Sequence, residues 1–264
     1  MFRVVERGCR RHLALGCRKP MSDAPLVSVR GLTFSYPGRP ALSEVSFEVR
    51  KGERIGLVGP NGAGKTTLFL CLAGVLGLRP GMATVAGLDP ATPADRKQLP
   101  TRVGIVFQNS DDQLFAATLA DDIAFGPLNL GLPREEVERR VNDALSRVEL
   151  TELRDRAPYH LSGGEKRRAA LAGVLAMRPE LLLLDEPSIF LDPRGRRELI
   201  RWLGDWAGSA IIASHDLDLV LDTCSRVIVL EAGRLVAEGE TNRILGDAAL
   251  MEQHGLEAPH RLRR

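Results

Sequence analysis

The sequence predicts an α/β fold with an antiparallel strand pair first, then a parallel sheet whose strands alternate with helices, and a helical insertion. Short apolar runs alternate with helical runs from Arg54 onward, as in βαβ units. Residues 181–184 are four consecutive leucines, which is typical of a strand buried on both faces of a parallel sheet. With 264 residues, 44% of them hydrophobic and 27% charged, the chain suits one globular domain with a subdomain.

The individual elements follow in order along the chain. Residues 26–36 and 41–49 alternate apolar and polar side chains around Pro37-Gly38, so we expect them to pair as antiparallel strands. The helices between about 110 and 177 form the insertion, and the whole domain is expected to span 21–246. Buried strands are expected at 54–58, 103–107, 181–184, 210–214 and 227–230, and helices from 65 onward and at 134–148, 163–177, 193–206 and 216–222.

The two ends of the chain differ from the domain between them. Residues 1–20 hold six basic side chains and one acid, and they lack the apolar stretch of ~7–15 residues that a signal peptide needs. We expect this segment to be disordered, or translation to begin at Met21. Residues 247–264 are expected to form a tail with a frayed basic end at 260–264. The net charge is only +2 and the basic surplus lies in residues 1–20, so no nucleic-acid partner is expected.

The cysteines argue against a zinc or redox site, and the apolar runs argue against a membrane-spanning segment. Cys9, Cys17, Cys71 and Cys224 form no C-x-x-C pair, which indicates reduced thiols rather than a zinc or redox site. The longest uncharged apolar run, 68–78, is about half of the ~20 residues that a membrane span needs. Any association with a membrane is therefore expected to go through a partner.

A glycine-rich loop between the strand at 54–58 and the following helix predicts a phosphate site. Its residues match G-x-x-x-x-G-K-[ST], the P-loop of a P-loop NTPase core. Glycines let backbone N–H groups line an anion-binding hollow, and the helix N-terminus adds its positive dipole end. We expect Lys65 to reach the β- and γ-phosphates of ATP and Thr66 to bind Mg²⁺. The predicted phosphate-binding residues are Gly59, Pro60, Asn61, Gly62, Ala63, Gly64, Lys65, Thr66 and Thr67.

Two carboxylates follow the buried strand at 181–184, at the edge where open α/β sheets bind ligands. Asp185 suits the acid that holds Mg²⁺, because this ion takes few protein carboxylates and keeps several waters. Glu186 comes next and points another way. It is the candidate general base for attack of water on the γ-phosphate.

A third motif lies about 20 residues before Asp185 and resembles the signature of the ABC ATPase family. It consists of Leu161, Ser162, Gly163, Gly164 and Glu165, where the family usually reads LSGGQ. This is again a helix N-terminus, capped by serine, with glycines that expose N–H groups. The resemblance implies a head-to-tail dimer in which each signature closes on the ATP held by the other subunit. It covers roughly residues 26–245.

The resemblance implies roles for four further residues. Tyr36 matches the aromatic that stacks on adenine, and Gln108 matches the glutamine that senses Mg²⁺ and the transport partner. His215 matches the switch histidine that contacts the γ-phosphate. Asp192 matches the acid of a segment, 188–192, that crosses the dimer interface. Ile189 and Phe190 in that segment are bulkier than the family's usual small residues.

The stretch after Gln108 resembles the energy-coupling-factor group of importers, which includes cobalt and nickel ATPases. This group usually reads QNPDDQLF and then DVAFGPxNLGL, and the chain has QNSDDQLF at 108–115 and DIAFGPLNLGL at 122–132, with Ser110 in place of proline. This stretch is acidic and is followed by the apolar Leu114 and Phe115. Such an apolar surface bordered by acidic groups would suit a basic helix of a membrane subunit.

The resemblance implies an ATPase, with Mg²⁺, at the cytoplasmic face of the membrane as a peripheral subunit. Its partners would be a second ATPase subunit (a copy or a paralogue), an integral membrane transport subunit and a substrate-capture subunit. The cargo stays open between cobalt or nickel ions and vitamins. The alternatives are a soluble ABC ATPase acting on nucleic acid or ribosomes and a binding module that needs no nucleotide. The chain has one set of motifs and no heptad run, which disfavours the soluble ATPase. Lys65, Asp185 and Glu186 are all present, which disfavours the binding module.

Overall fold

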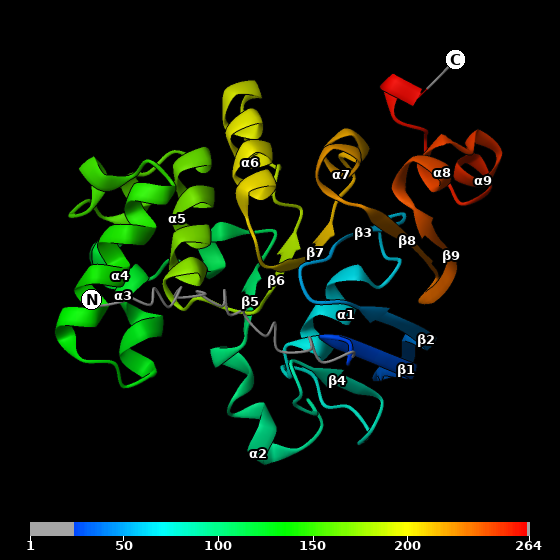
Figure 1. Cartoon of the computed structure of the whole chain (residues 1–264), viewed down its shortest axis with the longest axis horizontal. Helices are drawn as coiled ribbons and strands as arrows, with labels where there is room; N and C mark the ends of the chain where they lie inside the picture. Colours follow the sequence, from blue (N-terminus) through cyan, green and yellow to red (C-terminus); the bar gives the residue numbers. More distant parts are fainter. Residues whose placement is uncertain (1–23, 263–264) are drawn as a thin grey trace, which may run out of the picture.

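Two sheets and a helical subdomain make up the structure, a computed structural model that describes residues 24–262 (Figure 1). The expected segment 1–20 lies outside the described residues. The strands are β1 (Val27–Tyr36), β2 (Arg39–Val49), β3 (Arg54–Val58), β4 (Ala83–Val85), β5 (Val103–Val106), β6 (Leu181–Asp185), β7 (Ser209–Ala213), β8 (Arg226–Glu231) and β9 (Arg234–Glu240). The helices are α1 (Lys65–Leu72), α2 (Pro93–Arg96), α3 (Leu119–Asn129), α4 (Arg134–Arg147), α5 (Gly163–Ala176), α6 (Pro193–Asp205), α7 (Leu217–Thr223), α8 (Thr241–Gly246) and α9 (Ala248–Gln253).

The central sheet has the strand order β5-β6-β7-β3-β8-β9, with β9 antiparallel at one edge and the other strands parallel. Both faces of β6 are buried. Leu181 and Leu183 pack on the side of α1, while Leu182 and Leu184 pack on the side of α5 and α6. The prediction of a doubly covered parallel sheet from the leucine run is confirmed.

The second sheet is antiparallel, with the order β2-β1-β4. Strands β1 and β2 pair as expected, since Tyr36 faces Arg39 across the turn at Pro37-Gly38. The buried side chains of β1 and β2 join those of α1 in one cluster with the central sheet. Helix α1 and the P-loop before it therefore lie between the two sheets (Figure 1).

Helices α3, α4 and α5 form the inserted subdomain, which lies to the left in Figure 1. These helices run from Leu119 to Ala176. Val137, Val141, Ala144 and Leu145 are buried on one face of α4, at the spacing of helical turns, and the other face carries charges. This subdomain carries the signature residues at the N-terminus of α5.

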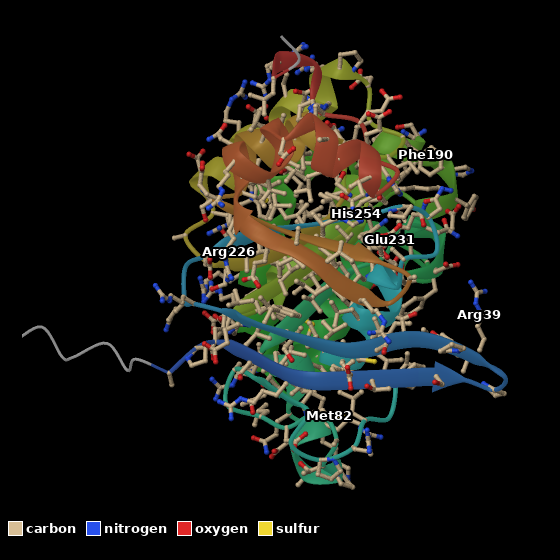
Figure 2. All side chains as sticks on the ribbon, turned by 90° about the vertical axis from the view of Figure 1, so that its right-hand side faces the viewer. Arg39, Met82, Phe190, Arg226, Glu231 and His254 are labelled. Carbon is tan, nitrogen blue, oxygen red and sulfur yellow. The ribbon has the colours of Figure 1, made fainter. Side chains whose placement is uncertain are left out.

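The C-terminal segment is more ordered than the sequence indicated. Helices α8 and α9 follow β9, and the buried His254 lies beside Glu231, with its Nδ1 2.7 Å from the carboxylate Oε2 (Figure 2). Residues His260–Leu262 form a 3₁₀ turn in which Arg261 donates to Asp218 and Asp222 of α7. The expectation of a frayed end is wrong for these three residues, because ion pairs with α7 hold them in place.

Candidate functional site

The P-loop adopts a backbone that only glycine suits at its last turn. Gly64 has φ +107°, and a Cβ there would lie 2.7 Å from the carbonyl oxygen of Ala41 and 2.9 Å from Leu42. The residue therefore has to be glycine, for both conformational and steric reasons. Gly64 is also the N-cap of α1 and supplies no side-chain cap. The first N–H groups of α1 are thus left for an anion.

Lys65 lies at the centre of this loop and is only 8% exposed. Its Nζ donates to the carbonyls of Gly59 at 2.6 Å and Pro60 at 3.2 Å. Burial lowers the pKa of Lys65, while the nearby carboxylates of Glu186 and Asp185 act in the opposite direction. The Lys65 ammonium is therefore held in a position to contact a phosphate bound in the P-loop.

Thr66 and Asp185 place two oxygen atoms, both possible metal ligands, next to each other near Lys65. The Thr66 hydroxyl donates to Asp185 Oδ2 at 2.6 Å, which joins the first turn of α1 to the end of β6. Burial raises the pKa of Asp185, and the Thr66 hydroxyl and the Lys65, Arg167 and His215 charges oppose that rise. A hydroxyl and a carboxylate at one point, on the floor of a polar cavity, form a donor set that fits Mg²⁺.

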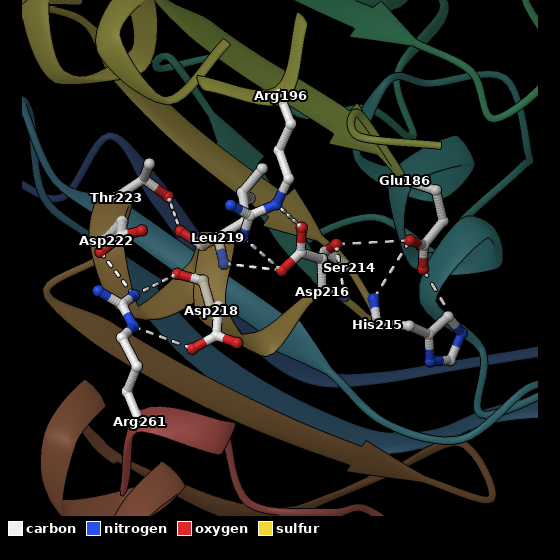
Figure 3. A network of polar contacts seen from close by, with 10 residues as sticks. All are labelled: Glu186, Arg196, Ser214, His215, Asp216, Asp218, Leu219, Asp222, Thr223 and Arg261. Atoms are coloured by element: carbon white, nitrogen blue, oxygen red, sulfur yellow. Dashed lines mark hydrogen bonds and ion pairs between the residues drawn. The ribbon is translucent and has the colours of Figure 1, made fainter. Parts of the chain in front are cut away.

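Glu186 and His215 lie next to each other and both line the same cavity (Figure 3). Glu186 Oε2 accepts from the backbone N–H of His215 at 3.2 Å and from the Ser214 hydroxyl at 3.4 Å. Its other oxygen, Oε1, is buried and forms no hydrogen bond within the described part of the chain, and it lies 3.4 Å from His215 Nε2. Glu186 also has φ +49°, a strained conformation for a residue with a side chain. A buried acceptor without a donor is suited to holding a water molecule.

One cavity of about 320 Å³ connects these groups. The structure places most of the predicted nucleotide residues on its wall, and Lys65 Nζ lies 3.4 Å from His215 Nε2 across it. Tyr36 stands at the mouth of the cavity, edge-on to Phe34 with ring centroids 5.1 Å apart. The lining residues are Tyr36, Arg39, Pro40, Ala41, Asn61, Gly62, Ala63, Gly64, Lys65, Thr66, Thr67, Gln108, Asp185, Glu186 and His215.

The signature lies elsewhere, as the sequence predicted. Ser162 and Glu165 form a capping box at the start of α5, in which the Glu165 carboxylate accepts from Ser162 N at 2.7 Å. That bond lowers the pKa of Glu165. The four residues 162–165 line a second cavity of about 580 Å³ together with Phe190 and Asp192, and the buried Leu161 anchors the turn. No P-loop residue lines this second cavity.

Arg167 is a structural centre of the site that sequence reasoning missed. Its guanidinium is 4% exposed and donates to the carbonyls of Phe107, Asp185 and Pro187. It thereby ties α5 to the loop of Gln108 and to the end of β6. Burial lowers its pKa to about 10. An arginine on a helix gives no signal of this role in the sequence.

Arg39 was also missed and lies on the P-loop side. It lines the nucleotide cavity from the tip of the β1–β2 hairpin, and its side chain projects there in Figure 2. Its Nη2 lies 3.9 Å from the position that a Cβ on Gly62 would take. It adds a positive charge at the mouth of the cavity.

Replacing Arg167 by alanine should lower the free energy of unfolding by about 2–4 kcal/mol, because buried carbonyls of three segments lose their donor. Denaturation in urea measures the change. Arg147→Ala is the control, since the one ion pair of Arg147 within residues 24–262 is a half-exposed pair with Asp143, and the variant should cost less than about 0.5 kcal/mol. Equal stability of the two variants would contradict the bridging role of Arg167.

Comparisons with known proteins identify the family of the chain. The family model described as "ABC transporter" matches residues 42–189, more than half of the chain. A putative ABC transporter ATP-binding protein of Synechocystis sp. is 50% identical over 240 residues, which cover 90% of this chain and 83% of that protein. The energy-coupling factor transporter ATP-binding protein EcfA of Methanothermobacter thermautotrophicus is 46% identical over 239 residues, which cover 89% and 77%.

A solved structure supports the same grouping. The structure of cbiO1 from Clostridium perfringens, described as part of the ABC transporter complex cbiONQ, has 34% sequence identity and a TM-score of 0.76. The match covers 87% of this chain and 94% of cbiO1. The chain therefore belongs to the ABC transporter family as an ATP-hydrolysing subunit, in the group that includes the energy-coupling factor ATP-binding proteins.

Proposed function

We propose that this chain powers an importer of the energy-coupling-factor type by closing on ATP together with a second ATPase subunit. The observation that carries the proposal is the separation of the two phosphate-binding surfaces. The P-loop cavity and the signature cavity share no lining residue, although both present helix N-terminal N–H groups. The signature of a partner subunit would complete the binding site of a triphosphate held in the P-loop. ATP would then act as a ligand of the dimer interface.

The P-loop side would bind and orient the nucleotide. Lys65 pairs with the β- and γ-phosphates, and Tyr36 offers its ring to adenine at the mouth of the cavity. Thr66 and Asp185 would hold Mg²⁺, with Gln108 on the same wall. When bound, Mg²⁺ neutralises charge on the phosphate oxygens.

Glu186 and His215 would act on the water and the γ-phosphate. Glu186 Oε1 has a free acceptor site, so it can orient a water molecule and take its proton. His215 Nε2 lies between Glu186 and Lys65, where it can contact the γ-phosphate. Loss of that phosphate removes contacts made only in the closed dimer, and the dimer reopens.

A groove lined by Gln113, five residues after Gln108, would receive the membrane subunit. Phe115 and Phe125 stack edge to face with centroids 5.0 Å apart, and Phe115 is 66% exposed. They border a groove of about 300 Å³ between β5, α3 and α5. Asp122 lies in its wall with Oδ2 buried and without a hydrogen bond in the described residues. Burial raises the pKa of Asp122. An apolar groove with one acidic group in its wall fits a basic amphipathic helix.

Gln113 connects this groove to the nucleotide cavity. Its Nε2 donates to Ile105 O at 3.0 Å and its Oε1 accepts from Phe107 N at 2.9 Å. The loop that holds Gln108 is thus tied at both ends to β5, and movement of a helix docked on Phe115 would reach Gln108. No helix of the described residues is long and apolar enough to cross a membrane. We infer peripheral attachment at the cytoplasmic face, through this groove.

The proposed cargo is a transition-metal ion, cobalt or nickel, or a vitamin, captured by a separate subunit. Support comes from the likeness to EcfA and to cbiO1, which is described as part of cbiONQ. The ATPase itself would not contact the cargo. A second ATPase subunit, either a copy or a paralogue, completes the proposed assembly.

Phe115→Asp tests the proposed membrane partner. The variant should lose co-purification with a polytopic membrane protein from detergent extracts, because a charge enters the apolar groove, while ATP binding should stay within about twofold. Val75→Asp is the matched control, since Val75 is also exposed but lies after α1, away from the groove. Retention of the membrane protein by Phe115→Asp, or recovery of ribosomes or DNA with the wild-type chain, would contradict the proposal.

A further inference from the structure

An ion pair between α6 and the N-cap of α7 lies beside Glu186 and His215 (Figure 3). Arg196 Nε donates to Asp216 Oδ2 at 2.5 Å and Nη2 donates to Oδ1 at 2.8 Å, which makes the pair bidentate. Asp216 also caps α7 by accepting from Leu219 N at 2.9 Å. Such a pair fixes orientation as well as distance, because two parallel bonds prevent rotation. Arg196 does not line the nucleotide cavity.

The pair holds one end of the segment that carries the switch histidine. Residues 214–216 are fixed at their other end by Glu186, which accepts from the Ser214 hydroxyl at 3.4 Å. Asp216 N donates to Ser214 Oγ at 3.0 Å, which closes the segment into a tight turn. His215 lies at its centre, and its backbone N–H donates to Glu186. A shift of Asp216 therefore moves His215 and the hydrogen bonds of Glu186 together.

The same ion pair is joined to the segment expected to cross the dimer interface. Asp192 is the N-cap of α6 and accepts from Gly195 N at 2.7 Å, and Arg196 N donates to Asp192 O at 2.9 Å. The same segment begins at Ser188, four residues before Asp192. Phe190, between them, is 72% exposed and has φ +64°. A partner that contacts Phe190 would therefore displace the first turn of α6, to which Arg196 belongs.

We propose that Arg196 is a positioning residue, which passes the docking of a partner subunit on residues 188–192 through Asp216 to His215 and Glu186. The inference rests on the proposed roles of His215 and Glu186. The bidentate contact acts as a rigid link: when α6 moves, the turn at 214–216 moves with it. Full alignment of the two reacting groups is then reached only in the closed dimer.

Steady-state ATP hydrolysis by the full chain tests this. Arg196→Ala should lower kcat by about ten- to hundredfold, since small misplacements of reacting groups have effects of that size. KM for ATP should change by less than about twofold, because Arg196 makes no contact in the nucleotide cavity. Arg196→Lys should recover only part of kcat, as an ammonium cannot make the bidentate contact. In a Glu186→Gln background, Arg196→Ala should still form the ATP-dependent dimer in size-exclusion chromatography.

Arg197→Ala is the matched control. Arg197 is the next residue of α6, it is exposed, and it forms no ion pair or side-chain hydrogen bond within residues 24–262, so hydrolysis should be unchanged. Normal kcat in Arg196→Ala, or a loss of ATP affinity or of the ATP-dependent dimer, would overturn the inference. Glu186→Gln alone tests the proposed function separately. Full hydrolysis in Arg196→Ala beside a strong loss in Glu186→Gln would therefore overturn only the role of Arg196.

Discussion

Replacing Glu186 by glutamine should lower the rate of ATP hydrolysis by about 10²–10⁴-fold, the usual contribution of a general base. The amide keeps the size of the side chain and can still accept from His215 N, so the cavity should keep its shape. It cannot take a proton from water. ATP should therefore bind without being consumed, and the ATP-bound dimer should accumulate. Phosphate release and size-exclusion chromatography with ATP measure the two effects.

Glu135→Gln is the control for the Glu186 variant. Glu135 is an exposed glutamate on α4 that does not line the nucleotide cavity. Glu135→Gln therefore makes the same chemical change outside the site. Its hydrolysis rate should equal that of the wild type. Undiminished turnover in Glu186→Gln would show that another group activates the water.

Lys65→Ala should weaken ATP binding by about 100-fold or more, because loss of one partner of a buried charged contact costs roughly 2–5 kcal/mol. Stability should change little. The carbonyls of Gly59 and Pro60 lose a donor, but the protein no longer pays for burying an ammonium. Titration with a fluorescent ATP analogue measures the affinity, and thermal unfolding measures the stability.

The exposed Lys97 provides the matched control, since Lys97→Ala removes the same charge from the surface at the end of α2. ATP affinity of that variant should equal the wild type. If Lys65→Ala bound ATP as tightly as Lys97→Ala, the phosphate would have to lie outside the P-loop.

The sequence predicted those parts of the fold whose signal is local. The leucines at 181–184 predicted β6 because both faces of that strand are buried, and the glycine-rich loop between an apolar run and a helical run predicted the succession of β3, the P-loop and α1. Strand β9 was missed, since it is an edge strand whose side chains alternate between exposed and half-buried, and three of its seven residues are charged. Helices α8 and α9 were missed because six residues are too few for a helical period to be recognised.

Motifs point to individual site residues, whereas contacts between distant segments give no signal in the sequence. Tyr36, Gln108, Asp185, Glu186 and His215 line one cavity although up to 179 positions separate them. Arg167 could not be predicted in the same way. Its role depends on carbonyls from the ends of β5 and β6 and from the loop after β6, which approach one another only in the folded chain.

The contact between His254 and Glu231 gives the last helix an indirect link to the nucleotide. Glu231 ends β8, and in the turn that follows it Gly233 donates its N–H to Ala63 of the P-loop at 2.9 Å. The preceding Leu230 carbonyl also lies where a Cβ on Gly59 would have to fit. Truncating the chain before His254, or fusing a bulky tag close to it, would thus weaken the contacts that support the P-loop. The ATP affinity measured on such a protein would be lower than that of the full chain.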